Sequence, residues 1–157
     1  MSTIDLHAIT TASPEQVSAA LTDFGPGRSK TFGHCTDECL EVHVQDPQYV
    51  EVTEGSHGVW ERLHYDLSNP DQIVMVTTDS NVWGGNSGHT YTCTRLPDGT
   101  TAIDAVVTPQ GKNLGGRILG LVLGTIGKGH LAKEFANTIK TIETRKPDAR
   151  STSAKHN

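Results

Sequence analysis

Residues 115–129 have the sequence GGRILGLVLGTIGKG, in which six glycines stand within an apolar segment. Four glycines share one stripe of a helix at about 100° per residue: Gly116, Gly120, Gly124 and Gly127. Further along the chain the same stripe carries large apolar residues: Leu131, Phe135, Ile139 and Ile142. A helix face without side chains leaves either a void or room for another backbone to approach closely. In a small domain built around a sheet, a void beside this helix predicts a ligand pocket.

The large apolar residues in the first half of this helix lie about half a turn from the glycine stripe: Ile118, Leu119, Val122, Leu123 and Ile126. Two explanations remain open. Either the helix is kinked or broken near residues 127–129, or its first half is buried on both sides, for example in a homodimer. We favour the kink, because glycine is one of the usual causes of kinks.

The composition indicates one domain and excludes several classes of protein. The chain has 157 residues, three cysteines and a net charge of −5, with no basic cluster of the kind that binds nucleic acid. The apolar stretch 118–126 is far shorter than the roughly 20 residues of a membrane span. We see no signal peptide, and we expect reduced cysteines in a cytoplasmic protein with no transmembrane segment and no nucleic-acid partner.

Period-two and helical patterns give the order of elements. We expect a strand near 3–11, a helix that starts with a capping box at Ser13 and Gln16 and ends at Gly25, and a short helix within 28–37. Strands are expected near 41–44, 49–53, 58–67, 72–78, 89–95 and 100–108, with turns at 54–56 and 97–99. The C-terminal helix then closes a domain of residues 1–146, and 147–157 are expected to form a polar, disordered tail.

This order predicts an α+β protein, because consecutive strands with short turns form an antiparallel sheet that the C-terminal helix must cover. Four segments carry a family resemblance: ASPEQV at 12–17, LTDF at 21–24, GVWER at 58–62 and NLGGRIL at 113–119. With them the chain resembles the START-like (SRPBCC) superfamily, in the branch of polyketide cyclase/dehydrase-like and lipid-transport proteins. The resemblance implies a helix-grip fold, in which a curved sheet of six to seven strands wraps around a long C-terminal helix beside an apolar cavity.

Ionisable residues on the predicted strands are the candidates for chemistry in such a cavity. Proton transfer or polarisation of a carbonyl would use groups on the concave face. The face is ambiguous from sequence: if Trp60 points inward, so do Arg62, His64 and Asp66, whereas Tyr65 inward would bring Val59, Glu61 and Leu63. An inward Tyr91 would bring His89 and Cys93 with it.

We predict ten ligand-binding residues: Trp60, Arg62, His64, Trp83, His89, Tyr91, Asp104, Gly120, Gly124 and Phe135. No catalytic residue is assigned, because the family resemblance carries no universal catalytic signature. We expect no cofactor and no metal: His34, Cys35, Cys39 and His43 lack the paired spacing of a zinc site.

Three functions remain open from the sequence. The first is binding or carriage of a small hydrophobic or amphipathic molecule. The second is a polyketide cyclase/dehydrase-like enzyme. The third is an interaction protein with a collapsed cavity, in which the apolar face of 118–126 makes a dimer contact. An apolar cavity lining favours the carrier, and facing ionisable groups with shifted pKa values favour the enzyme.

Overall fold

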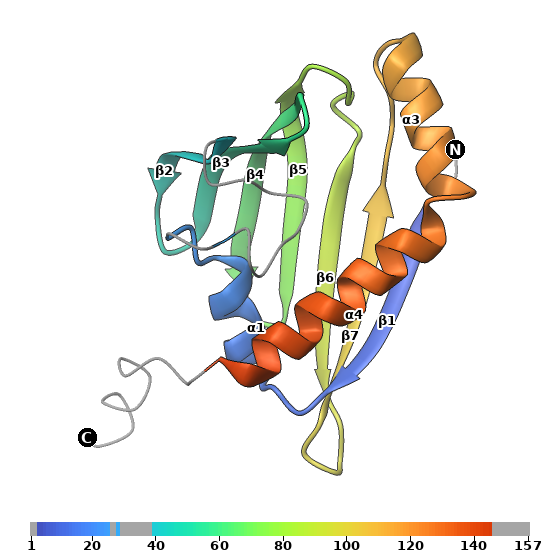
Figure 1. Ribbon diagram of the computed structural model, residues 1–157. Helices are drawn as coiled ribbons and strands as arrows, with labels where there is room; N and C mark the ends of the chain where they lie inside the picture. The colour runs from blue at the N-terminus through green and yellow to red at the C-terminus, as the bar shows by residue number, and fades with distance from the viewer. Residues whose placement is uncertain (1–2, 26–27, 29–38, 146–157) are drawn as a thin grey trace.

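The computed structural model describes residues 3–25, 28 and 39–145. Seven antiparallel strands form one curved sheet with the order β1-β7-β6-β5-β4-β3-β2, and α1 and α4 lie across one of its faces (Figure 1). This is the α+β helix-grip architecture that the sequence predicts. The expected short helix at 28–37, except Arg28, and the tail at 147–157 lie outside the described residues.

The described elements follow the predicted order. The strands are β1 (Ile4–Thr10), β2 (Glu41–Gln45), β3 (Tyr49–Ser56), β4 (Val59–Asn69), β5 (Gln72–Ser80), β6 (Gly88–Arg95) and β7 (Thr101–Thr108). The helices are α1 (Pro14–Leu21), α3 (Leu114–Gly124) and α4 (Lys128–Thr144).

The capping box predicted for α1 is confirmed. The Ser13 hydroxyl accepts a hydrogen bond from the Gln16 N–H at 3.2 Å, and the Gln16 side chain accepts one from the Ser13 N–H at 2.8 Å. The helix is shorter than expected, because it ends at Leu21 and Thr22 is its C-cap. Phe24 therefore reaches the core from the segment that follows α1.

One predicted turn was misplaced. The β3–β4 hairpin turns at His57 and Gly58, both with positive φ (54° and 80°), and not at residues 54–56. Gly55 instead pairs with Trp60 within the sheet, where a Cβ on Gly55 would lie 2.3 Å from the Val59 carbonyl oxygen. The turn predicted at 97–99 is confirmed, with Gly99 at a φ of 87°.

The core resolves the ambiguity about which face of β4 points inward. Leu63 and Tyr65 are among the most deeply buried side chains, at 2% and 1% exposure. Because side chains alternate along a strand, Arg62 and His64 point to the outer face of the sheet. On the helix side of the core, α4 contributes Ile142, at 1% exposure.

The C-terminal helix is broken rather than continuous. α3 ends at Gly124, and α4 begins at Lys128 with Gly127 as its N-cap. The Gly127 N–H donates to the Val122 carbonyl at 2.7 Å, which closes the last turn of α3. The break explains why the apolar face changes side between the two halves of the segment.

Glycine allows α3 to approach the rest of the protein through its backbone. A Cβ on Gly116 would lie 2.0 Å from the Val82 carbonyl oxygen and 3.0 Å from the Cα of Gly111. Asn113 caps the helix by accepting from the Gly116 N–H at 2.7 Å. At Gly116 the missing side chain therefore makes room for the backbone of another segment. Of the two possibilities that the sequence left open for the glycine stripe, a void or a close backbone contact, the second is found at this position.

Candidate ligand-binding cavity

A cavity of about 460 Å³ lies between the concave face of the sheet and the two C-terminal helices. This volume falls within the roughly 300–1,000 Å³ of small-molecule sites. Three of its lining residues are solvent-exposed and mark its opening: His57, Trp60 and His130. The opening therefore lies between the β3–β4 turn and the start of α4.

Most of the cavity wall is apolar. The sheet contributes Ile103 and Val107 of β7, and α4 contributes Leu131 and Phe135. α3 adds its inner side chains Leu119 and Leu123, and α1 adds Val17 and Leu21. Such a wall would favour a molecule with a large hydrophobic part, because removing apolar surface from water is favourable.

Glu54, which lines the cavity, belongs to a buried ion pair. Arg28 Nε donates to Glu54 Oε1 at 2.9 Å, and the two side chains are 3% and 6% exposed. The Tyr65 hydroxyl donates to the same Glu54 oxygen at 3.2 Å and accepts from Arg28 Nη2 at 3.2 Å. Arg28 also donates to the Asp23 carbonyl at 2.7 Å and lies 4.5 Å above the Phe24 ring. These contacts compensate the cost of burying two charges.

Two further polar side chains, His89 and Tyr91, line the cavity from β6. Burial, and secondarily the charge of Glu54, raises the pKa of Tyr91 to about 12. Burial lowers the pKa of His89, and the charge of Glu54 offsets this effect only in part. At neutral pH the cavity thus presents a protonated phenol and an uncharged imidazole. Neither side chain makes a hydrogen bond within the part of the chain that the structure describes.

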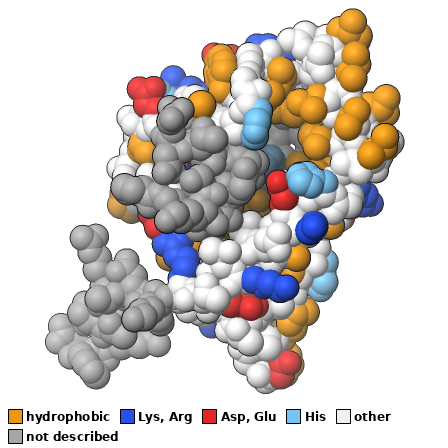
Figure 2. All heavy atoms as spheres, viewed as in Figure 1, with side chains coloured by type: hydrophobic (Ala, Val, Ile, Leu, Met, Phe, Trp, Pro, Cys, Tyr) orange, Lys and Arg blue, Asp and Glu red, His pale blue; other side chains and the backbone are white. Residues whose placement is uncertain are grey.

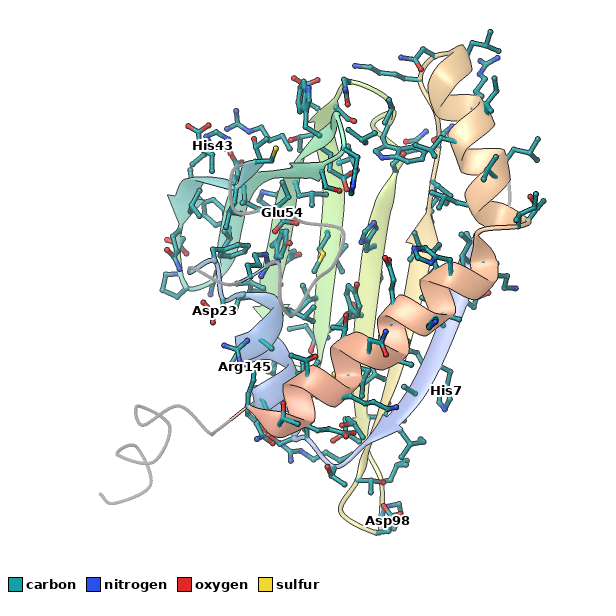
Figure 3. The ribbon with its side chains drawn as sticks, in the orientation of Figure 1. His7, Asp23, His43, Glu54, Asp98 and Arg145 are labelled. Carbon is teal, nitrogen blue, oxygen red and sulfur yellow. The ribbon has the colours of Figure 1, made fainter. Side chains whose placement is uncertain are left out.

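Three of the ten predicted binding residues lie away from the cavity. Arg62 and His64 face outward, where they contact Glu51 at 3.1 and 3.5 Å. Asp104 pairs with His7 at 2.6 Å, and both side chains are more than half exposed. In Figure 3, Glu54 lies near the centre of the molecule and His7 at its periphery. The inward row of Arg62, His64 and Asp66 that one alternative required does not form.

Five other predicted residues line the cavity: Trp60, Trp83, His89, Tyr91 and Phe135. Gly120 lies behind its wall, since a Cβ there would stand 3.6 Å from the Trp83 ring and 3.2 Å from the Pro109 carbonyl oxygen. Gly124 is the last residue of α3 and does not line the cavity. The predicted residues on β6 and α4 therefore come together, whereas those on the outer face of β4 and β7 do not.

The two described cysteines give no support to nucleophilic catalysis. Cys93 packs against the core, and burial raises the pKa of its thiol to about 11, so the reactive thiolate is scarce at neutral pH. Cys39 is exposed, and Cys35 and His34 lie outside the described residues. Among the described residues, no group of three or more His, Cys, Asp or Glu side chains is placed to hold a metal ion.

The residues that sequence reasoning missed are Arg28, Glu54 and Tyr65. A signal for Glu54 was present, because it follows Val50 and Val52 at period two on a strand whose other members on that face are buried. No local pattern predicted its partner, since Arg28 is 26 residues away in the sequence.

Comparisons with solved structures identify the fold. A START superfamily protein from Mycobacterium smegmatis superposes with a TM-score of 0.66 and 12% identity, over 89% of this chain and 98% of the other. The chain has a START-like fold. The Zhui aromatase/cyclase from Streptomyces sp. R1128 gives a TM-score of 0.65 at 13% identity, over 94% and 97% of the two chains.

DynU16, from the dynemicin biosynthetic locus, gives a TM-score of 0.59 at 15% identity, over 94% of this chain and 49% of the other. No family model and no curated protein matches the chain. At these identities the likeness establishes the fold and leaves the function to be argued from the cavity.

Proposed function

We propose that this protein binds a small hydrophobic or amphipathic molecule in the cavity between the sheet and the C-terminal helices. One observation carries the proposal: apolar walls surround about 460 Å³ of space into which His89 and Tyr91 present polar groups without hydrogen-bond partners among the described residues. A few polar groups within an apolar cavity are typical of sites that orient a ligand by one functional group. The fold neighbours support this proposal, since they are START-like and aromatase/cyclase proteins.

The electrostatics favour an uncharged polar group on the ligand. Three glutamates line the cavity, Glu54, Glu61 and Glu134, and the described lining contains no lysine. The guanidinium of Arg28 is already bonded to Glu54, Tyr65 and the Asp23 carbonyl. A ligand hydroxyl or carbonyl would bond to Tyr91 and His89 without the desolvation cost that an unpaired carboxylate carries.

A pair of neighbouring valines provides the test. Val107 lines the cavity and Val106, which precedes it on β7, does not. With N-phenyl-1-naphthylamine as a fluorescent hydrophobic probe, Val107→Phe should weaken binding at least about ten-fold by filling space, whereas Val106→Phe should bind like the parent protein. Equal affinity of both variants would place the ligand elsewhere. Native mass spectrometry of freshly purified protein, followed by denaturing extraction, would then identify a co-purified ligand.

A specific observation also favours an enzyme of the cyclase/dehydrase type as the second candidate. Glu54, His89 and Tyr91 together line the cavity and a small recess beside it, so three ionisable groups lie on one part of its wall, where the charge of Glu54 acts on the other two. There the Tyr91 hydroxyl would donate to a substrate carbonyl, and the neutral His89 would accept a proton from the adjacent carbon.

Exchange of α-protons in D₂O, followed by NMR on a β-ketoacyl thioester, tests this second candidate. The parent protein should accelerate exchange, and Tyr91→Phe and His89→Gln should each slow it about 10²-fold or more. A protein that binds the thioester without accelerating exchange is a carrier. A homodimer was one of the alternatives left open by the sequence, and it remains untested; the open cavity gives no support to the collapsed interaction domain.

A further inference from the structure

α3 exposes large apolar side chains that no other described element covers. Ile126, just beyond the helix, is 86% exposed, Leu114 75%, Leu121 68%, Ile118 55% and Val122 42%. We call these five residues the α3 outer face. Figure 2 shows hydrophobic side chains gathered over α3 at the upper right of the molecule. A contiguous apolar patch of this kind marks an interaction site more often than scattered single residues do.

The geometry of α3 separates this face from the cavity. At about 100° per residue, Leu114, Ile118, Leu121 and Val122 fall within an arc of about 100°. Leu119 and Leu123 lie about 110° and 150° from the centre of this arc, on the side that lines the cavity. The apolar residues of α3 therefore form two separate surfaces, one that lines the cavity and one that faces solvent. A ligand in the cavity would leave the α3 outer face exposed.

The charged residues in the sequence segment that contains α3 are all basic. No aspartate or glutamate occurs between Asp104 and Glu134, and this segment carries Lys112, Arg117, Lys128 and Lys133. All four cations are exposed. Two of them, Lys112 and Lys128, lie at the two ends of α3, and Arg117 lies beside the apolar arc. In a chain with a net charge of −5, this segment contributes +4.

These charges favour an anionic lipid surface over a second copy of the chain. In a two-fold symmetric dimer through α3, like charges would face each other across the interface, since both partners present the same patch. An apolar helix face bordered by cations is instead typical of helices that lie in the plane of a membrane interface. None of the described helices is long and apolar enough to cross a bilayer, so this mode of binding is peripheral.

We propose that the α3 outer face docks on a lipid bilayer that contains anionic lipids. The five apolar side chains enter the interfacial region, and the four cations bind lipid phosphates and carboxylates. In this orientation the inner side of α3 and the cavity opening near His130 lie close to the bilayer surface. The proposal does not depend on the cavity ligand, because the α3 outer face is formed by residues that do not line the cavity.

Co-sedimentation of the full chain with phosphatidylcholine vesicles, with and without phosphatidylserine, tests the docking. We expect at least about ten-fold tighter binding to the anionic vesicles and a loss of this preference at high salt. Two isoleucines of nearly equal exposure form a matched pair: Ile118→Ser should weaken binding about five-fold or more, whereas Ile9→Ser on β1, at 51% exposure, should not. Lys128→Gln should weaken binding about five-fold, and Lys140→Gln at the other end of α4 should have no effect.

Three outcomes would overturn the proposal. The first is no binding to anionic vesicles, and the second is binding in which Ile118→Ser and Ile9→Ser have the same effect. The third is a dimer in analytical ultracentrifugation that Ile118→Ser dissociates while vesicles capture no protein, which would assign the face to a second copy. Circular dichroism of each variant distinguishes loss of docking from loss of folding.

Discussion

Two parts of the cavity surroundings differ in how they are built. On one side Arg28, Glu54 and Tyr65 are buried and hydrogen-bond to one another, and we call these three residues the ion-pair cluster. On the other side α3 is attached through glycine backbone contacts and carries exposed apolar side chains. Burial of paired charges constrains the ion-pair cluster, whereas much of the apolar surface of α3 remains accessible to solvent.

This difference predicts where substitutions affect stability and where they affect binding. Changes in the ion-pair cluster remove hydrogen-bond partners from buried polar groups, which is costly wherever water cannot replace the lost contact. Changes on the α3 outer face remove side chains that already contact water. Variants of the ion-pair cluster should therefore unfold more easily, and variants of the α3 outer face should fold normally and differ in their binding to lipid vesicles.

The largest expected effect is at Glu54. Glu54→Gln removes the carboxylate charge that pairs with the buried Arg28 and should lower the free energy of unfolding by about 3–5 kcal/mol, measured by urea denaturation. Glu51→Gln is the control on the same strand, because Glu51 faces solvent and pairs with Arg62 on the surface. The double variant Arg28→Met/Glu54→Leu removes both charges and should cost much less than Glu54→Gln. A loss for Glu54→Gln no larger than for Glu51→Gln would contradict the role assigned to the ion-pair cluster.

The fold was largely predictable, because its signals are local. The capping box at Ser13 and Gln16 and the turn at Gly99 each follow from two or three adjacent residues. The break after Gly124 follows from the switch of the apolar face. The misplaced turn shows the limit, because Gly55 is required by a close approach of Trp60 across the hairpin, which no local pattern contains.

The residues that line the cavity could be predicted only where the inward face of a strand was known. Tyr91 and His89 share a face by alternation, so placing one of them places the other. For β4 the sequence left open whether Trp60 or Tyr65 points inward. The prediction that Arg62 and His64 line the cavity depended on this choice. By alternation, Trp60 and Tyr65 belong to opposite faces of β4. Trp60 still reaches the cavity opening, because it lies at the end of β4 beside the turn.

The next effect is a loss of stability at alkaline pH through Tyr91. The folded protein keeps the phenolic proton up to about pH 12, whereas the unfolded chain releases it near pH 10. The stability that Tyr91 contributes is therefore complete below about pH 10 and is lost as the pH rises to about 12, by up to roughly 3 kcal/mol. Tyr91→Phe should reduce the slope of this part of the curve of unfolding free energy against pH, and Tyr65 and Cys93, whose pKa values burial also raises, account for the slope that remains. A variant with the same alkaline slope as the parent protein would show that Tyr91 is solvated in the folded state.

A smaller effect is expected from two adjacent glycines in α3. Gly116→Ala places a Cβ 2.0 Å from the Val82 carbonyl oxygen, so the first turn of α3 must move, at a cost of about 1–3 kcal/mol. Gly115→Ala meets only the Asn113 side chain at 3.6 Å and should stabilise the helix by up to about 1 kcal/mol. Thermal unfolding measures both changes, and hydrogen exchange of the α3 amides should increase for Gly116→Ala alone. Equal behaviour of the two variants would mean that the backbone contact with Val82 does not hold α3 in place.

The smallest expected effect on stability is on the α3 outer face. Leu121 is 68% exposed, so Leu121→Ala removes little buried surface and should change the free energy of unfolding by no more than about 0.5 kcal/mol. The variant should also bind N-phenyl-1-naphthylamine like the parent protein, because Leu121 does not line the cavity. A loss above about 1 kcal/mol in urea denaturation would mean that Leu121 is buried in solution against another chain, since a side chain that contacts water in both states contributes little to folding. Repeating the measurement over a range of protein concentrations would then reveal the association, because only the stability of an oligomer depends on protein concentration.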